Sequence, residues 1–236
     1  MIMLIFATFT EVVQLYNTGN KYYAEGNFQS AIECYEKALL NTKNKDIYYN
    51  LGNAYFKMGK IGKAIVQYRR AYTLYPRDGD ILYNLNFLRN FRPDKIMSMP
   101  NPFFQFLDRS FHYLSPDESH ILSSIAFLAI SIFLSLYLIL RNKIFVWSSI
   151  FCSLFFLYFL VSSSLWQAEK NSNSAVVVER ELKAYSGPGE EYKEILVIHD
   201  GTEARIQEER NGYYLIQLPG GIGGWVRMDG VERIFD

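Results

Sequence analysis

A five-residue string recurs at a nearly fixed interval near the start of the chain. Residues 16–20 read YNTGN, residues 49–53 read YNLGN, and a looser copy, YNLNF, begins at Tyr83. The offset between copies is 33 residues and then 34 residues. Repetition at such a period marks repeat architectures, in which one unit cannot bury its own apolar face and must stack on its neighbours. The sequence therefore predicts a stack of similar units in this part of the chain.

The similarity continues beyond the five residues and follows the spacing of two helices in each unit. Gly19 and Gly52 fall inside the first helix of their units, where glycine costs about 1 kcal/mol relative to alanine. We expect such a cost where a neighbouring helix approaches too closely for a side chain. The matched positions are Leu15, Gly19, Tyr22, Ala31, Tyr35 and Ala38, which return as Tyr48, Gly52, Tyr55, Ala64, Tyr68 and Ala71.

This pattern resembles the tetratricopeptide repeat, a helix–turn–helix unit of about 34 residues. The resemblance covers residues 11–93, as two repeats that end at Pro76 and one following helix. In the third copy Asn86 replaces the glycine and Arg89 replaces the tyrosine. Both changes are typical of a terminal capping helix, whose outer face meets water or another domain.

The resemblance implies that the first helix of each repeat lines a concave groove for a partner protein. Tyrosine offers a large contact with a polar tip, and asparagine can both donate and accept hydrogen bonds. Lysine and arginine do not cluster among these positions, which disfavours a dedicated carboxylate site. The alternative is that the same residues only build the scaffold. The candidate groove residues are Tyr16, Asn20, Tyr23, Tyr49, Asn53, Phe56, Tyr83 and Phe87.

Residues 121–140 form a run without any charged side chain, and most of them are Ile, Leu or Phe. Ser115, Pro116 and Glu118 precede the run and predict a helix start, with a capping box and a proline at the first helical position. Twenty helical residues cover about 30 Å, which is the thickness of the hydrocarbon core of a bilayer. We therefore predict a membrane-spanning helix.

A second uncharged run covers residues 144–166. Trp147 and Trp166 lie near its two ends, as an interfacial aromatic belt requires. The two runs together predict a two-helix transmembrane hairpin over residues 121–166. Neither run contains Asp, Glu, Lys, Arg or His, so an ion or proton pathway is not expected.

The loop between the two runs predicts the orientation of the hairpin. Arg141 and Lys143 place two positive charges at the tip, which favours the cytoplasmic side. Both flanking regions would then be periplasmic, on the outer side of a bacterial inner membrane. Residues 1–10 are mostly apolar and resemble a signal segment, which agrees with export. The alternative for this segment is an extension of the first repeat helix.

Residues 94–120 are predicted as a linker. Three prolines between positions 93 and 102 break the helical pattern, and aromatic and polar residues alternate after them. This segment can lie in the headgroup layer as an amphipathic helix or pack against the repeats.

Residues 175–236 change from a helical period to the alternation of short strands separated by Gly-, Pro- and Asp-containing turns. The motifs Ser186-Gly187-Pro188-Gly189, Gly201-Thr202, Tyr213-Tyr214 and Gly223-Gly224-Trp225-Val226 resemble those of a bacterial SH3-type domain, a small barrel. The resemblance implies a ligand-binding face, and the alternative is that its aromatic residues are core packing. The candidate residues of this face are Tyr185, Tyr192, Tyr213 and Trp225.

Charge and histidine spacing exclude several classes of function. The chain has 24 basic and 24 acidic residues, so a nucleic-acid partner is not expected. His112, His120 and His199 do not have the spacing of metal ligands or of a nucleophile–base pair. We therefore predict no catalytic residue, no cofactor and no metal, and a protein that is not an enzyme.

The order of parts predicts a multidomain membrane protein with an all-α repeat solenoid, a two-helix transmembrane hairpin and a small all-β SH3-like barrel. This order resembles the BatE family of bacterial aerotolerance operons. The resemblance implies an inner-membrane adaptor in a stress-tolerance system, beside von Willebrand factor A-domain membrane proteins and a MoxR-type ATPase. Two weak modules tethered to one hairpin would act by avidity. The alternative is an anchor or sensor whose SH3-like domain binds peptidoglycan.

Overall fold

The computed structural model describes residues 2–91 and 101–235 of the chain. The chain divides into two compact units. The first unit joins the two ends of the chain, Met1–Ser98 and Ser172–Asp236, and the second is Met99–Asn171. The N-terminal repeats and the C-terminal strands therefore belong to one body, although about seventy residues separate them in sequence.

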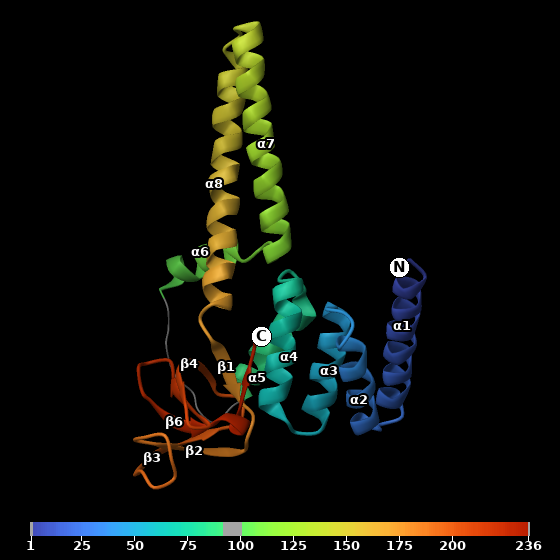
Figure 1. Cartoon of the computed structure of the whole chain (residues 1–236), viewed down its shortest axis with the longest axis vertical. Helices are drawn as coiled ribbons and strands as arrows, with labels where there is room; N and C mark the ends of the chain where they lie inside the picture. Colours follow the sequence, from blue (N-terminus) through green and yellow to red (C-terminus); the bar gives the residue numbers. More distant parts are fainter. Residues whose placement is uncertain (1, 92–100, 236) are drawn as a thin grey trace. The chain divides into compact units, whose positions relative to one another are not determined.

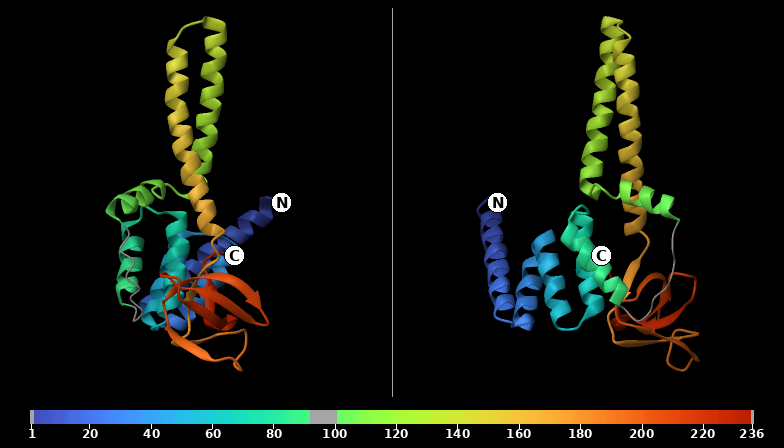
Figure 2. Two further views of the ribbon diagram at one scale, coloured as in Figure 1. Left: turned by 90° about the vertical axis from the view of Figure 1, so that its left-hand side faces the viewer. Right: turned by 180° about the vertical axis from the view of Figure 1, so that it is seen from behind.

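The N-terminal part of the first unit is a stack of helices in which α1 packs on α2 and α3 packs on α4 (Figure 1, Figure 2). This confirms the predicted helical repeats and the additional helix after them. The helix α1 runs unbroken from Ile2, so residues 2–10 continue directly into the first repeat helix. A signal role for this segment stays a prediction. The helices are α1 Ile2–Ala24, α2 Phe28–Leu39, α3 Lys45–Lys57, α4 Ile61–Leu74 and α5 Gly79–Phe91.

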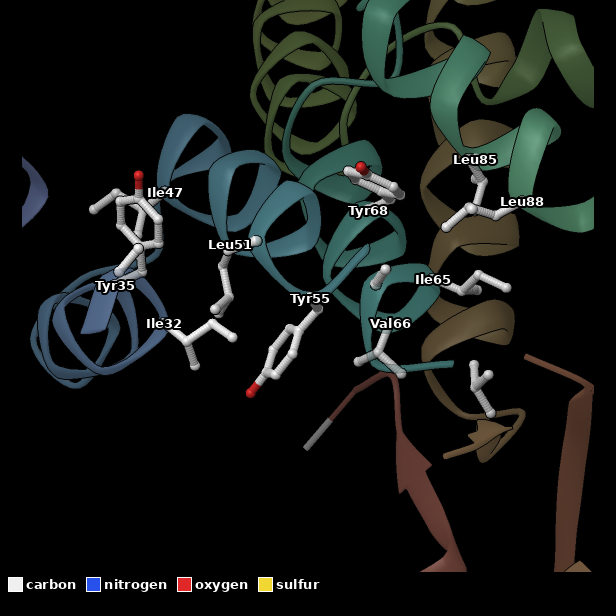
Figure 3. Close-up of a cluster of buried hydrophobic side chains, with 14 of the residues drawn as sticks. Ile32, Tyr35, Ile47, Leu51, Tyr55, Ile65, Val66, Tyr68, Leu85 and Leu88 are labelled. Atoms are coloured by element: carbon white, nitrogen blue, oxygen red, sulfur yellow. The ribbon is translucent and has the colours of Figure 1, made fainter. Parts of the chain in front are cut away.

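The glycine of the repeated string makes room for a tyrosine of the second helix. A Cβ atom on Gly19 would lie 2.6 Å from Cε1 of Tyr35, and one on Gly52 would lie 2.7 Å from Cε1 of Tyr68. Both tyrosines are buried in the core of the stack (Figure 3). The predicted close approach of a neighbouring helix is confirmed.

The C-terminal part of the first unit is an antiparallel sheet with the strand order β3-β2-β6-β5-β4-β1-β7 over the described residues. It confirms the predicted small all-β region. Val176 and Ile234 from this part join the core of the helical stack. The strands are β1 Ser174–Val177, β2 Glu181–Tyr185, β3 Glu194–His199, β4 Glu203–Arg210, β5 Tyr213–Gln217, β6 Gly223–Arg227 and β7 Val231–Arg233.

The second unit contains α6 Pro102–Phe111, α7 Pro116–Leu140 and α8 Ile144–Lys170. The predicted capping box is present, since Ser115 accepts from the Glu118 amide and the Glu118 side chain accepts from the Ser115 amide. The helices α7 and α8 pack along each other, and both are long and apolar enough to cross a membrane. Residues 94–100 of the predicted linker lie outside the described residues.

One of the two tryptophans of α8 departs from the predicted aromatic belt. Trp147 is exposed as expected, but Trp166 is only 1% exposed. The indole Nε1 of Trp166 donates a hydrogen bond to the Leu114 carbonyl oxygen at 2.8 Å. The belt prediction is wrong for Trp166, because this ring packs inside the unit.

Candidate functional site

The first repeated string takes part in a hydrogen-bond network that joins three helices. The Tyr35 hydroxyl of α2 donates to Oδ1 of Asn20 in α1 at 2.8 Å. Nδ2 of Asn50 in α3 donates to the same oxygen at 3.0 Å and to the Tyr16 hydroxyl at 3.2 Å. Burial raises the pKa of Tyr35 above its usual range, so its hydroxyl stays protonated and donates.

The same network recurs one repeat later. The Tyr68 hydroxyl of α4 donates to Oδ1 of Asn53 in α3 at 2.6 Å. Nδ2 of Asn84 in α5 donates to the Tyr49 hydroxyl at 3.0 Å and to Asn53 Oδ1 at 3.4 Å. The repeated tyrosine and asparagine therefore specify how each repeat meets the next.

Four candidate groove residues take part in this network. Tyr16, Asn20, Tyr49 and Asn53 have polar atoms that bond other helices of the stack. Their arrangement favours the scaffold interpretation for these four positions. The sequence interpretation missed two members of the network, Asn50 and Asn84. The signal was present, because an asparagine follows the tyrosine in each copy of the string.

The other four candidates are aromatic, and two of them are exposed at the end of the stack. Tyr23 packs against Phe28, and Phe56 packs edge-on against Phe87 with 6.1 Å between ring centroids. Tyr83 is 70% exposed and Phe87 is 45% exposed. Residues four apart share one helix face, so these two rings lie on the same side of α5. We call Phe56, Tyr83 and Phe87 the α5 patch.

The N-terminus of α4 is capped by a residue from the sheet region. In the first repeat Asn27 caps α2, but Lys60 at the matching position of α4 makes no side-chain cap. Instead the Asp200 carboxylate accepts from the Ile61 amide at 2.9 Å and from the Gly62 amide at 2.8 Å. A negative charge here also suits the helix dipole. Burial raises the pKa of Asp200, and the amide hydrogen bonds oppose that rise.

Two glycines allow the sheet region to approach α4 this closely. A Cβ atom on Gly62 would overlap the Val177 carbonyl oxygen and the Asp200 carboxylate. Gly201 has a φ of +85° and lies against Ile61, where a Cβ would be 3.1 Å from Cγ2. The matching position of the first repeat is Gln29. Gly62 therefore distinguishes the second repeat, which packs against the sheet region, from the first repeat.

Two arginines of the repeats bind the sheet region at separate points. Arg70 donates to Glu232 at 3.1 Å and to the carbonyl oxygens of Ile234 and Arg233 at 3.0 and 2.9 Å. Arg89 binds Glu203 with two hydrogen bonds of 2.6 and 2.8 Å. Arg89 replaces the repeat tyrosine, so the predicted capping helix does meet another domain.

These contacts correct the avidity mechanism. That mechanism treats the repeats and the SH3-like region as two separately tethered modules. In the structure they share a core and several polar contacts, among them those at Asp200, Arg70 and Arg89. They therefore present one composite surface.

Three of the four candidate residues of the sheet face lie on the neighbouring strands β2, β6 and β5, whereas Tyr192 lies in the turn before β3. Tyr185 of β2 is directly opposite Trp225 of β6, and Leu215 of β5 is opposite Trp225 on the other side. Tyr213 lies two residues before Leu215 in β5, so the two side chains are on the same face of the sheet. Burial and the nearby Glu190 carboxylate raise the pKa of Tyr213. Tyr192 is 45% exposed and covers Gly187, where a Cβ would overlap its ring.

The titratable residues are dispersed. In the described ranges, no group of three or more His, Cys, Asp and Glu side chains could hold a metal ion. His112 contacts Trp166, His120 contacts Ser163, and His199 ends β3.

Comparison with known protein families identifies the repeats. A family model described as "TPR repeat" matches residues 19–59, and one described as "Tetratricopeptide repeat" matches residues 46–78. These matches cover α2, α3 and α4 and the second copy of the repeated string, residues 49–53. No curated protein matches the chain.

Proposed function

We propose that the protein is a membrane-anchored adaptor whose helical repeats bind a partner protein through the α5 patch. The observation that carries this proposal is that Tyr83 and Phe87 are exposed. The matching positions in the preceding repeat contact the next helix of the stack. Tyr83 matches Tyr49, and Phe87 matches Asn53. In α3 these two positions bind the next first helix through Asn84.

The occupant that fits this surface is a helix of a partner protein. An incoming helix would continue the interface by which α1 meets α3 and α3 meets α5. It would bring an apolar side chain to Phe87, since an aromatic ring replaces the amide there. It would also bring a side-chain donor to the Tyr83 hydroxyl, as Asn50 and Asn84 do within the stack. Exposed tyrosine is a frequent anchor of such contacts.

The anchor would be the hairpin of α7 and α8. Their outward residues form a continuous apolar surface, with Ile125, Leu128 and Leu154 each more than half exposed. Water does not favour so large an apolar surface, whereas the bilayer core does. The loop with Arg141 and Lys143 would face the cytoplasm, and the first unit would be periplasmic.

The order of parts supports a place in a Bat-type aerotolerance or stress-tolerance system of a bacterial inner membrane. The partners would be von Willebrand factor A-domain membrane proteins and, indirectly, a MoxR-type ATPase. The role would be that of a scaffold and not of an enzyme.

A second candidate function is cell-wall binding by the SH3-like sheet. It is supported by the adjacent positions of Tyr185 and Trp225 across two strands, because neighbouring aromatic rings form a flat contact surface. Binding of the full chain to purified peptidoglycan, and its loss in Trp225→Ala, would favour this candidate.

Co-purification from solubilised membranes tests the adaptor proposal. We expect the double variant Tyr83→Ala/Phe87→Ala to lose protein partners that the wild-type chain retains. Leu40→Ala is the matched control, because Leu40 is an exposed apolar residue at the end of α2. Retention of every partner by the double variant would reject the α5 patch as the binding surface. Recovery of partners without any A-domain membrane protein would reject only the Bat-type assignment.

A further inference from the structure

The helix α6 has two chemically distinct faces. Four of its polar side chains, counting the C-cap His112, follow the spacing i, i+3, i+4 and i+7, which places them along one side of the helix. Ser110 lies on the other side, where its hydroxyl donates to the Phe106 carbonyl oxygen at 2.8 Å. The opposite side is apolar and largely exposed, with Phe103 at 61% and Phe106 at 66%. The polar positions are Gln105, Asp108, Arg109 and His112, and the apolar positions are Phe103, Phe106, Leu107 and Phe111.

The end of α6 and the turn after it are fixed to α8. The Tyr158 hydroxyl donates to the Ser110 carbonyl oxygen at 2.6 Å, and Ser162 Oγ donates to the Phe111 carbonyl oxygen at 2.6 Å. Trp166 Nε1 donates to the Leu114 carbonyl oxygen one further turn along α8. Tyr158 and Trp166 are about 12 Å apart along the helix axis. These bonds set how α6 is rotated relative to the hairpin.

The two faces of α6 point in opposite directions along the hairpin. Phe111, on the apolar face, stacks on Tyr158 in the uncharged part of α8, with 5.3 Å between ring centroids. His112, on the polar face, lies against Trp166 and places Nε2 3.5 Å from a carboxylate oxygen of Glu169. Glu169 belongs to the polar end of α8. The apolar face of α6 therefore looks toward the uncharged span, and the polar face looks toward the charged end.

The axis of α6 crosses the foot of the hairpin instead of running along it (Figure 1, Figure 2). A bilayer that holds α7 and α8 across its core would therefore hold α6 in its plane. At that level the apolar face of α6 would meet acyl chains, and the polar face would meet headgroups and water.

We propose that α6 is an interfacial membrane helix, which inserts Phe103, Phe106 and Leu107 below the headgroups at the foot of the hairpin. The inference rests on the proposed membrane anchoring by α7 and α8. Asp108 and Arg109 balance each other in charge, so insertion depends on apolar contact and not on anionic lipid. The helix fixes the depth and tilt of the hairpin from one side of the membrane.

Nitroxide accessibility in lipid nanodiscs tests this proposal on the full chain. Cys34 and Cys152 are replaced by alanine, and single labels are attached to F103C, F106C, R109C and L128C in zwitterionic lipid. Each label reports its collision rate with oxygen, which concentrates in the acyl region, and with a water-soluble nickel chelate. We expect the oxygen-to-nickel ratio at Phe103 and Phe106 to exceed that at Arg109 on the order of threefold or more. Addition of anionic lipid should leave this difference unchanged.

The label at position 128 in α7 distinguishes a failure of the interfacial-helix proposal from a failure of the membrane-anchor proposal. An oxygen-rich signal at Leu128, with equal ratios at Phe106 and Arg109, would reject the interfacial helix and keep the anchor. Exclusion of both reagents at Phe103 and Phe106 would show that protein covers this face, which also rejects the inference. A nickel-rich signal at Leu128 would reject the membrane anchor itself.

Discussion

The Asp200 carboxylate accepts a hydrogen bond from the Gly62 amide at 2.8 Å, although 138 residues separate the two in sequence. This contact supplies the N-cap that α4 lacks locally and joins the sheet region to the second repeat. The protein therefore completes one of its repeats with a side chain from the far end of the chain. The stability of the repeats and that of the sheet should depend on each other.

Removal of this cap should destabilise the first unit as a whole. Asp200→Ala leaves the Ile61 and Gly62 amides without their acceptor, and loss of a helix cap costs about 1–2 kcal/mol. The change in the free energy of unfolding is measured by chemical unfolding of the full chain in detergent. Hydrogen exchange follows the repeats and the sheet separately. Glu208→Ala, at an exposed position of β4, is the control and should stay within about 0.5 kcal/mol of wild type. Destabilisation confined to the sheet would contradict the coupling.

The same carboxyl group should make stability depend on pH. Burial raises the pKa of Asp200 in the folded state above its usual value, so folding favours the protonated form. The stability that this group contributes is fully present below its unfolded pKa, about 3.9, and is lost as the pH rises through the higher folded pKa. Asp200→Asn removes this titration.

We therefore expect the free energy of unfolding of wild type, relative to Asp200→Asn, to fall as the pH rises from about 4 toward 7. The measurement is urea unfolding of both proteins across this range. All other titrating groups are common to the two proteins, so their contributions largely cancel. If the unfolding free energy of wild type relative to Asp200→Asn rises with pH instead, the amide hydrogen bonds have a larger effect on the Asp200 pKa than burial has.

Gly62→Ala should weaken the contact between repeats and sheet. Alanine at a helix position is favoured over glycine by up to about 1 kcal/mol, so propensity alone predicts stabilisation. The added Cβ would overlap the Val177 carbonyl oxygen, and overpacking of this kind typically costs about 1–3 kcal/mol. Thermal unfolding should therefore show net destabilisation.

Gly79→Ala is the matched control for this variant. Gly79 begins α5, and a Cβ built on it meets nothing within 4 Å. Its stability should equal or slightly exceed that of wild type. If Gly62→Ala behaves like Gly79→Ala, the close approach of the sheet to α4 is absent in solution.

Loss of an inter-repeat asparagine should also destabilise the stack. Asn50→Ala removes the donor to Asn20 and Tyr16, and the loss of hydrogen bonds to such partly buried groups costs about 1 kcal/mol or more. Asn17, the matching asparagine of α1, is exposed, so Asn17→Ala should have little effect. Denaturant unfolding compares the two variants. Equal effects would mean that the network contributes nothing specific to the repeat interface.

Sequence periodicity predicted the features that depend on neighbouring residues. Gly19 and Gly52, the capping box at Ser115 and the two long apolar helices all follow from local spacing and composition. Their physical causes act within one helix or between adjacent helices. The family matches to the repeats agree with this pattern.

Contacts between distant parts of the chain were not predictable in the same way. Nothing in the neighbourhood of Asp200 or Arg70 indicates which element each will meet, because each partner lies more than a hundred residues away. Lys60 occupies the position in α4 at which Asn27 caps α2, and the distant Asp200 supplies the cap instead. Trp166 has the position of a belt residue, but the turn after α6 covers it.

The central claim, that the α5 patch binds a partner protein, is tested most directly by site-specific photo-crosslinking in intact membranes. A benzophenone amino acid replaces Tyr83 in the full chain, and a second protein carries it at Leu40, an exposed control position outside the patch. We expect a discrete protein adduct at position 83 that is absent at position 40 and is lost when Phe87→Ala is added. Adducts that are identical at the two positions, or that survive the loss of Phe87, would contradict the claim.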